Sequence, residues 1–237
     1  MISLVYAYYE NARMFQIQQA NWLNYPVHAQ KEMEVIITDD CSAKNPLLPQ
    51  DISTVGEYDF SLFFIQKKIS WNWLEARNIG AKHAKYDWLL LTDMDHVVTP
   101  GVFEALLKKR HKFDPEIVYQ FARVVAPGMT KYKPHNDSFF VSKKLFWKSG
   151  GYDEDYSGQY GTSGIFRRRL FSVAKKHKEL SNLSLVLYPR DFVEDASTRD
   201  LPRKEGRDPT AIKHITAWKL SRRREIQLFA QPYERLV

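Results

Sequence analysis

The sequence predicts an α/β fold, in which a mixed, mainly parallel sheet is flanked by helices in a single domain that carries a basic C-terminal extension. Two observations predict it. Short runs rich in apolar and β-branched residues alternate with segments of helical period, which is the pattern of β-α-β units. The chain has 237 residues, of which 44% are hydrophobic and 27% are charged, and this is enough to bury one sizeable core.

Three strands and a helix are expected in the first part of the chain. Residues 2–8 form an apolar run and are the first strand. Residues 12–26 place apolar side chains at helical spacing until Pro26 ends the helix. Residues 33–40, which end in two aspartates, and residues 60–66 are the next two strands, because both are short runs of β-branched or aromatic residues.

Helices and strands continue to alternate in the second part of the chain. Residues 71–85 have helical period, and residues 87–95 contain the unbroken apolar run of a strand buried on both faces. Residues 100–110 open on a proline, which is typical of a first helical turn. Residues 116–126 are a fifth strand, and residues 142–151 are a short helix that ends on two glycines.

The positive charge is concentrated near the C-terminus. The formal net charge is +7, and the segment 199–224 alone holds nine basic and three acidic side chains. Such asymmetry suggests an anionic partner, namely the phosphates of a small ligand, a nucleic acid backbone or a lipid surface, and a merely solvated tail is the alternative. The nine basic residues are Arg199, Arg203, Lys204, Arg207, Lys213, Lys219, Arg222, Arg223 and Arg224.

Composition also bears on the location of the protein. No apolar run approaches the roughly 18 residues that span a bilayer. The N-terminal residues lack a basic leader and a small-residue cleavage site, so we expect a strand there and not a signal peptide. Cys41 is the single cysteine, which excludes an internal disulfide and a cysteine-based zinc cluster. A reducing cytoplasm is the simplest location.

Two of the expected strands end in carboxylates. Asp39 and Asp40 end the second strand, and Asp93 and Asp95 end the fourth. Ligands of open α/β sheets bind beyond the carboxyl ends of parallel strands, so both pairs are expected in one crevice. An Asp-x-Asp pair alone is a weak signal because such pairs are common in turns, but its place at a strand end favours a site for a hard divalent cation.

Four segments together resemble a known family. In order, "AYYEN", "VIITDDCS", "EARNIGAKHAKYDWLLLTDMDH" and "SKKLFWKSGGYDEDY" are similar to the family 2 glycosyltransferases of GT-A fold, from about residue 2 to about residue 170. The resemblance implies a GT-A domain at 1–195, with a donor half at about 1–100 and an acceptor half at about 101–195. Residues 196–237 are then a basic C-terminal lid or helix segment.

The resemblance implies a reaction and a metal. A sugar passes from a nucleoside diphosphate sugar, with a uridine diphosphate sugar as the first expectation, to a hydroxyl acceptor by single displacement with inversion. Mn²⁺ or Mg²⁺ stabilises the charge that develops on the diphosphate. The implied metal ligands are Asp93, Asp95 and His214, although a lone surface histidine is the alternative for His214. His96, which follows Asp95, either ligates the metal or only shapes the turn.

The nucleotide-sugar contacts are implied in the same way. Asp39 and Asp40 match the residues that contact the base and the ribose, with an Asx turn as the alternative, and Tyr8 is expected beside them. The remaining donor contacts are expected from Asp93, Arg77, Arg203 and Arg207. Arg77 either bridges the strand-end carboxylates or reaches the diphosphate, with a position on a helix surface as the alternative.

The pattern breaks where the catalytic base is expected. Family members open a helix near the acceptor with an acidic residue that removes the acceptor proton, and Ser163 stands there instead. A hydroxyl without a partner does not serve as a base near pH 7. Three explanations are open. A nearby carboxylate serves as the base in place of Ser163, the chain is a disabled variant, or the chain binds donor without efficient transfer. The candidate carboxylates are Asp153, Asp155, Glu194 and Asp195.

Three functional hypotheses therefore stand. The first is metal-dependent transfer to a hydroxyl acceptor. The second keeps this chemistry but takes a hydroxylated pyrimidine in DNA as acceptor, as in phage DNA modification, which the basic segment supports. The third is a donor-binding protein without transferase activity. A dinucleotide-binding Rossmann enzyme is excluded, because no G-x-G-x-x-G follows the first strand.

Overall fold

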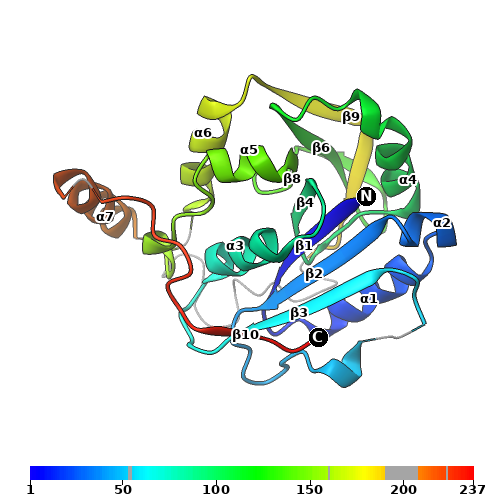
Figure 1. The fold of residues 1–237 in the computed structure, drawn as a ribbon, viewed down its shortest axis with the longest axis horizontal. Helices are drawn as coiled ribbons and strands as arrows, with labels where there is room; N and C mark the ends of the chain where they lie inside the picture. Colours follow the sequence, from blue (N-terminus) through cyan, green and yellow to red (C-terminus); the bar gives the residue numbers. More distant parts are fainter. Residues whose placement is uncertain (53–54, 160, 190–207, 223) are drawn as a thin grey trace.

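The computed structural model describes residues 1–52, 55–159, 161–189, 208–222 and 224–237. Within these residues one mixed, ten-stranded sheet carries helices on both faces (Figure 1). Its order is β10-β3-β2-β1-β4-β8-β6-β9-β5, and β7 pairs with β6. The strands are β1 (Ile2–Tyr8), β2 (Met33–Asp39), β3 (Asp59–Ile65), β4 (Trp88–Asp93), β5 (His96–Val97), β6 (Ile117–Val125), β7 (Thr130–Tyr132), β8 (Phe139–Ser142), β9 (Lys176–Leu187) and β10 (Tyr233–Arg235). The α-helices are α1 (Ala12–Leu23), α2 (Val27–Gln30), α3 (Trp73–His83), α4 (Pro100–Lys109), α5 (Lys143–Lys148), α6 (Ser163–Val173) and α7 (Pro209–Ser221), and the 3-10 helices are η1 (Pro49–Asp51), η2 (Arg110–Lys112) and η3 (Glu154–Tyr156).

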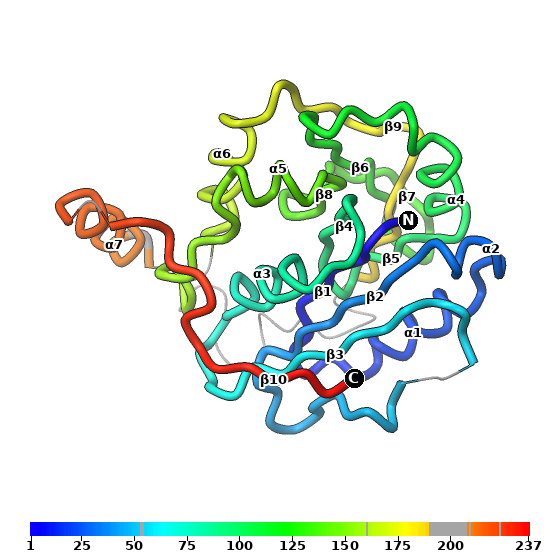
Figure 2. The backbone as a smooth tube through the Cα atoms, viewed as in Figure 1, coloured from blue at the N-terminus to red at the C-terminus, as the bar shows by residue number. Residues whose placement is uncertain are grey.

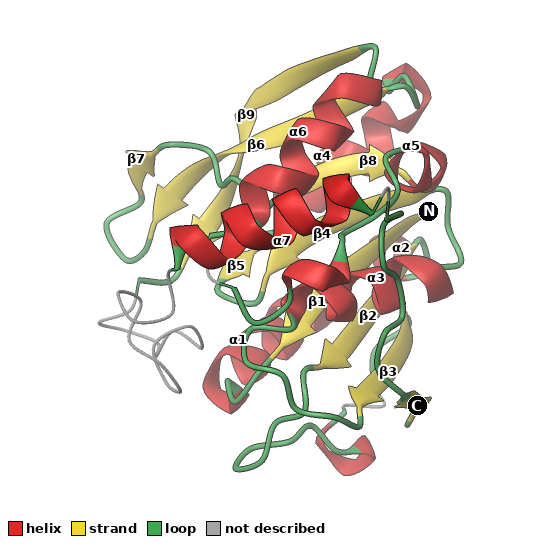
Figure 3. Ribbon diagram, turned by 90° about the vertical axis from the view of Figure 1, so that its left-hand side faces the viewer, coloured by secondary structure: helices red, strands yellow, loops and turns green. Residues whose placement is uncertain are grey.

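Strands β3, β2, β1 and β4 are parallel neighbours and form the buried centre of the sheet. All seven residues of β2 are buried, because α1 covers one face and α3 covers the other. Trp22 of α1 packs against Tyr6, and Ile79 of α3 lies in the same core cluster as Val5 on the opposite face. Gly80 allows the close approach of α3, because a Cβ there would lie 2.5 Å from Cγ1 of Val5. The arrowheads of β1, β2 and β3 point the same way (Figure 3), so the loops that follow them share one edge.

Every strand and helix that periodicity predicts is present. The predicted strands are β1, β2, β3, β4 and β6, and the predicted helices are α1, α3, α4 and α5. The predicted glycine end of α5 is also confirmed. Gly150 follows the helix with φ of +85°, and a Cβ there would lie 2.2 Å from Cδ1 of Ile226. The α/β class and the mixed sheet are therefore as expected.

Five strands of the described sheet, β5, β7, β8, β9 and β10, were not predicted from the sequence. The four residues of β8 lie between β4 and β6 and run antiparallel to both. The first half of β9 is largely exposed and lacks a regular apolar alternation, and β10 is a three-residue strand at the edge of β3. Short edge strands and exposed strands carry little pattern of their own, because their backbone partners determine them.

The C-terminal segment crosses the protein from α7 to β10. In Figure 2 the red trace runs from α7 past α3 and ends beside β3. The backbone N–H groups of Ala230 and Gln231 donate to the carboxylates of Glu154 and Glu75 at 2.7 Å each. The expected domain boundary near residue 195 lies outside the described residues. None of the described helices has both the length and the apolar character that crossing a membrane requires.

The basic segment 199–224 is partly neutralised within the chain. Four of its basic residues are described, and two of them form ion pairs. The ammonium group of Lys219 lies 3.0 Å from Asp153 and 2.6 Å from Asp155, and the guanidinium of Arg224 lies 3.1 Å from Asp155. Lys219 is only 9% exposed. These two cations therefore anchor α7 and the chain after it.

Glu154 joins α3 to the C-terminal segment through a buried carboxylate. Its Oε1 accepts from Asn78 at 2.7 Å and its Oε2 accepts from Ala230 N. Burial raises the pKa of Glu154 from 4.5 to about 7, although these hydrogen bonds lower it. The folded protein thus holds this proton more tightly than the unfolded chain does, and its stability falls as the pH rises between these two values.

We expect the pH dependence of stability to weaken in Glu154→Gln. For the unaltered protein, this carboxylate lowers the free energy of unfolding by roughly 2–3 kcal/mol as the pH rises from about 4.5 to about 7. Glutamine does not titrate, so this part of the slope disappears. Urea denaturation of both proteins at several pH values measures this slope. If the free energy of unfolding changes with pH equally in both proteins, the raised pKa of Glu154 is contradicted.

Candidate functional site

The carboxyl ends of β2 and β4 place two of the predicted aspartates on either side of β1. Tyr8 of β1 pairs with Asp39 of β2, and Ala7 pairs with Asp93 of β4. Adjacent strands lie about 4.8 Å apart, so the ends of β2 and β4 are roughly 10 Å from each other. The expected convergence of the two strand ends is therefore present in the fold.

Asp39 and Asp40 form the floor of the β2 side of this edge. The fully buried carboxylate of Asp39 accepts from Ser42 N at 2.8 Å and from Leu47 N at 2.9 Å, so the turn considered as an alternative is present. Burial raises the pKa of Asp39 to about 6 despite these bonds. Burial also raises the pKa of Asp40, whose Oδ1 is buried and accepts no hydrogen bond from the described residues. Asp40 thus has a buried acceptor oxygen without a partner among the described residues.

The loop after β2 is held by two residues of the β1 end. The carboxylate of Glu10 accepts from three consecutive backbone N–H groups, those of Ala43 at 2.6 Å, Lys44 at 2.8 Å and Asn45 at 2.7 Å. The hydroxyl of Tyr8, which is 0% exposed, donates to the Asn45 carbonyl at 2.6 Å. The structure therefore places Tyr8 under the loop, while Glu10 was missed because its partners are backbone groups that have no signature in the sequence.

Arg77 is a buried cation that organises the β4 side of this edge. Its side chain is 0% exposed, so the helix-surface interpretation is wrong. Nη2 forms an ion pair with Oδ1 of Asp93, and Nη1 donates to the Asp137 carbonyl at 2.6 Å and to the Tyr152 hydroxyl at 3.0 Å. Burial alone lowers the pKa of Arg77, but Tyr152, Asp93 and Asp137 outweigh it and raise the pKa. Trp73 forms a wall beside it, with its ring centroid 4.9 Å from the guanidinium carbon.

Asp93 and two histidines form a group that fits a divalent cation. One potential ligand atom from each of Asp93, His96 and His135 lies within 4.8 Å of the others. Oδ2 of Asp93 is 3.4 Å from Nε2 of His135, and the two imidazoles stack with centroids 4.3 Å apart. Burial lowers the pKa of His135 to about 4, so the ring is neutral at pH 7 and keeps a lone pair for a metal. A carboxylate oxygen together with an imidazole nitrogen suits Mn²⁺ better than Mg²⁺.

The other expected metal ligands lie differently. A carboxylate oxygen of Asp95 is 2.6 Å from Nδ1 of His96, whose Nε2 is 2.9 Å from Nη1 of Arg123. Burial alone raises the pKa of Asp95, but His96, His135 and Arg123 lower it below its ordinary range. His214 is an exposed residue of α7 and is not part of the group formed by Asp93 and the two histidines. Arg203 and Arg207 lie outside the described residues.

Comparison with known proteins identifies the family. The sequence matches the family model "Glycosyl transferase family 2" over residues 22–177, about two thirds of the chain. The chain belongs to glycosyltransferase family 2. An uncharacterized glycosyltransferase of Haemophilus influenzae is 36% identical over 75 residues, which are 32% of this chain and 24% of the relative.

Solved structures confirm the GT-A fold. S. aureus TarS 1-349 in complex with UDP-GlcNAc has a TM-score of 0.67 at 14% identity, and the match covers 84% of this chain and 61% of that one. The mannosyltransferase PcManGT from Pyrobaculum calidifontis, in complex with GDP-Man and Mn²⁺, has a TM-score of 0.58 at 14% identity and covers 78% and 56%. This glycosyltransferase family 2 chain thus spans less than two thirds of the length of these relatives.

The position at which the resemblance implies the family's catalytic base lies at the start of a helix. Ser163 is the first residue of α6. Asp153 is bonded to Lys219 and lies 3.6 Å from Arg169, and Asp155 is held by Lys219 and Arg224. Neither carboxylate is therefore available as a free base. Glu194 and Asp195, the two other candidates, lie outside the described residues.

Asp137, which the sequence did not single out, is the carboxylate beside Ser163. It lies in the loop before β8, and its carboxylate is near Ser163. Burial raises the pKa of Asp137 to about 6, against the lowering effect of Arg77. Residues 137 and 163 come together because β8 packs next to α6, where Phe139 contacts Phe166. No local sequence pattern could have predicted that contact.

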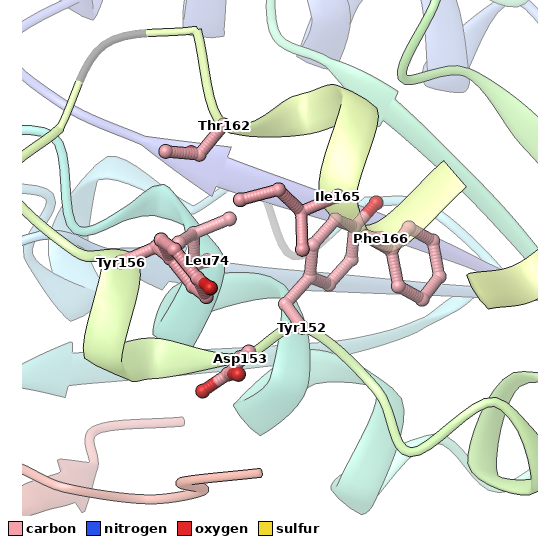
Figure 4. A pocket seen from close by; sticks show the side chains of 7 residues that line it. All are labelled: Leu74, Tyr152, Asp153, Tyr156, Thr162, Ile165 and Phe166. Carbon is pink, nitrogen blue, oxygen red and sulfur yellow. The ribbon is translucent and has the colours of Figure 1, made fainter. Parts of the chain in front are cut away.

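A small pocket of about 10 Å³, room for about one water molecule, lies beneath the start of α6. In Figure 4 the side chains of Tyr152, Ile165 and Phe166 gather on one side of it. Its lining also includes Leu74, Asp153, Tyr156 and Thr162. None of the strand-end aspartates lines this pocket. The pocket is therefore separate from the group around Asp93.

Proposed function

We propose that this chain transfers a sugar from a nucleoside diphosphate sugar to a hydroxyl acceptor, with a divalent cation bound at Asp93. The observation that carries the proposal is the placement of that carboxylate. Asp93 ends a central parallel strand, one oxygen pairs with the buried Arg77, and the other faces His135. Its side chain is 43% exposed, so a ligand can reach it.

The cation acts on the diphosphate leaving group, and Arg77 acts through Asp93. When bound, the cation offsets the negative charge that develops on phosphate oxygens as the sugar bond breaks. Arg77 orients Asp93 for this role, because it holds one oxygen and leaves the other toward the histidines. The nitrogen donor of His135 favours Mn²⁺ over Mg²⁺, whereas both ring nitrogens of His96 are engaged by Asp95 and Arg123. The Mn²⁺ complex of the Pyrobaculum mannosyltransferase supports this choice.

The β2 end and its loop bind the nucleoside. Asp40 has a buried acceptor oxygen that the described residues leave unpaired, and such an oxygen suits a base N–H or a ribose hydroxyl. Asp39, Glu10 and Tyr8 hold the loop around it. A uridine diphosphate sugar is the first candidate donor, supported by the UDP-GlcNAc complex of TarS. The family assignment supports inversion by single displacement.

Ligand-dependent stabilisation tests this function without knowledge of the acceptor. We expect UDP or GDP together with Mn²⁺ to raise the melting temperature by several degrees, because saturation at 100 times Kd adds about 2.7 kcal/mol. Either ligand alone should have a much smaller effect. Asp93→Asn should abolish the joint effect. The matched control Asp59→Asn, at the first residue of β3, should retain it. The proposal is contradicted if UDP or GDP with Mn²⁺ stabilises both variants equally, or if it fails to stabilise the unaltered protein.

A further inference from the structure

The C-terminal strap, residues 225–231 between α7 and β10, packs on the turn that precedes Tyr152. Two glycines in this turn leave room for it. A Cβ on Gly150 would lie 2.2 Å from Cδ1 of Ile226, and a Cβ on Gly151 would lie 3.5 Å from Cδ2 of Leu228. The strap therefore contacts the chain directly beside a residue that binds Arg77.

Two consecutive amides of the strap donate to buried carboxylates. Ala230 N donates to Oε2 of Glu154 and Gln231 N donates to Oε1 of Glu75, at 2.7 Å each. Glu75 is 0% exposed and Glu154 is 5% exposed. Gln227 also accepts from the backbone N–H of Glu154 at 3.0 Å. Release of the strap would leave buried oxygens without these donors, which costs free energy and favours the docked strap.

Asn78 connects Glu154 to Tyr152. Its Nδ2 donates to Oε1 of Glu154 and to the Tyr152 carbonyl at 2.7 Å each, and its Oδ1 accepts from Tyr152 N at 2.9 Å. Asn78 is 0% exposed. A rotated amide would exchange donor and acceptor and break these bonds, so the side chain is held in one orientation. Its position therefore depends on both Glu154 and Tyr152.

Tyr152 in turn contacts the cation that holds Asp93. The Tyr152 hydroxyl accepts from Nη1 of Arg77 at 3.0 Å, and the ring packs edge-on against Trp73 with centroids 5.2 Å apart. Nη2 of Arg77 pairs with Asp93. A continuous series of contacts therefore joins the strap to the proposed ligand of the cation. Its members, in order, are Glu154, Asn78, Tyr152, Arg77 and Asp93.

We propose that Asn78 is a positioning residue that couples docking of the C-terminal strap to binding of the nucleoside diphosphate and its cation. This inference rests on the proposed function. A ligand at Asp93 holds Arg77 and Tyr152 in one arrangement. That arrangement favours the Asn78 orientation that binds Glu154, and so it favours the docked strap. The coupling is reciprocal, because each event changes the equilibrium of the other by the same factor.

A purely structural role of the strap is the competing account, in which it only stabilises the fold. The two accounts differ in the effect of the ligand on local opening. Amides of a short connecting segment exchange their hydrogens when that segment opens locally. A strap that is only structural opens to the same extent with and without ligand, whereas a coupled strap opens less often when the ligand is bound.

Hydrogen exchange of the Ala230 and Gln231 amides tests the coupling in the unaltered protein. It is measured with and without Mn²⁺ and the diphosphate that binds, UDP or GDP. We expect the ligands to slow exchange at both amides about fivefold or more, the lower end of couplings between sites. The reference is the amide of Lys175, which donates to the Glu116 carbonyl near the opposite edge of the sheet. Its exchange should change less than about twofold.

Two variants test the role of Asn78. Asn78→Ala removes no hydrogen bond of the strap itself but cuts its connection to Tyr152. We expect it to raise the Kd for the diphosphate with Mn²⁺ about fivefold or more and to abolish the slowing at Gln231. The matched control Lys82→Met does the reverse, because Lys82 contacts the Phe229 ring of the strap but not Asn78. It should keep both the Kd and the slowing.

The outcomes separate this inference from the proposed function. If UDP or GDP binds with Mn²⁺ and the strap amides exchange equally fast in both states, the inference fails while donor binding stands. That comparison uses only the unaltered protein, so it decides the matter even if Asn78→Ala does not fold. A folded Asn78→Ala that keeps the Kd and the slowing also overturns the inference. If neither diphosphate binds with Mn²⁺, the proposed function fails and the inference fails with it.

Discussion

Arg77→Met is expected to lower the free energy of unfolding by about 3 kcal/mol, because removal of one partner leaves buried polar groups unpaired. The change removes the donor of the Asp137 carbonyl and of the Tyr152 hydroxyl, together with the counter-ion of Asp93. Asp93 is 43% exposed and can be hydrated, which keeps the loss near the lower end of the range for buried ion pairs. Urea denaturation measures the difference.

Two further variants make the Arg77 result specific. Arg77→Lys keeps the charge but loses the planar fork, so it should recover only part of the loss. The matched control Arg168→Met, at an exposed position of α6, should change stability by less than about 0.5 kcal/mol. A loss below about 1 kcal/mol for Arg77→Met would show that this buried cation does not hold the site together.

Asp93→Asn is expected to reduce donor turnover by a factor on the order of 10²–10³, the scale of losing one electrostatic contact to the developing charge. The amide keeps an oxygen that can accept from Arg77 but loses the negative charge that a divalent cation requires. Uptake of Mn²⁺ in the presence of UDP, measured by titration calorimetry, should be lost together with turnover.

The stability of Asp93→Asn separates this result from general damage. Because the site of Asp93 is half open to water, the loss in free energy of unfolding should stay within about 2 kcal/mol. Mn²⁺ uptake that persists in Asp93→Asn, with turnover close to that of the unaltered protein, would place the cation elsewhere. The exposed Asp59→Asn control should match the unaltered protein in both measurements.

The parallel half of the fold could be predicted from local patterns. β1, β2 and β4 are nearly continuous apolar runs because helices cover both of their faces, and such runs are visible without knowledge of their neighbours. The same holds for α1 and α3, whose apolar period marks the faces that pack on the sheet. Asp39 and Asp93 were placed correctly at one edge because parallel strands end on the same side.

The functional groups that were missed depend on contacts between distant segments. His135 lies close to Asp93, and Asp137 lies close to Ser163, only because β8 is inserted antiparallel between β4 and β6. Glu10 binds backbone N–H groups, which any residue can offer. Arg77 has the sequence pattern of an ordinary helix residue, and its burial is decided by the packing of α3 next to Tyr152.

Sequence alone determined the α/β class, the family and the strand-end aspartates, because hydrophobic period and motif order are local properties of a chain. Tertiary structure alone decided which groups surround those aspartates. Arg77 is buried as the counter-ion of Asp93, His135 comes from a loop about forty residues away, and Asp137 lies near the start of α6, where the family's acid is expected. The reason is that charge pairing and ligand geometry depend on distances of a few ångströms between segments, and only the packed sheet sets those distances.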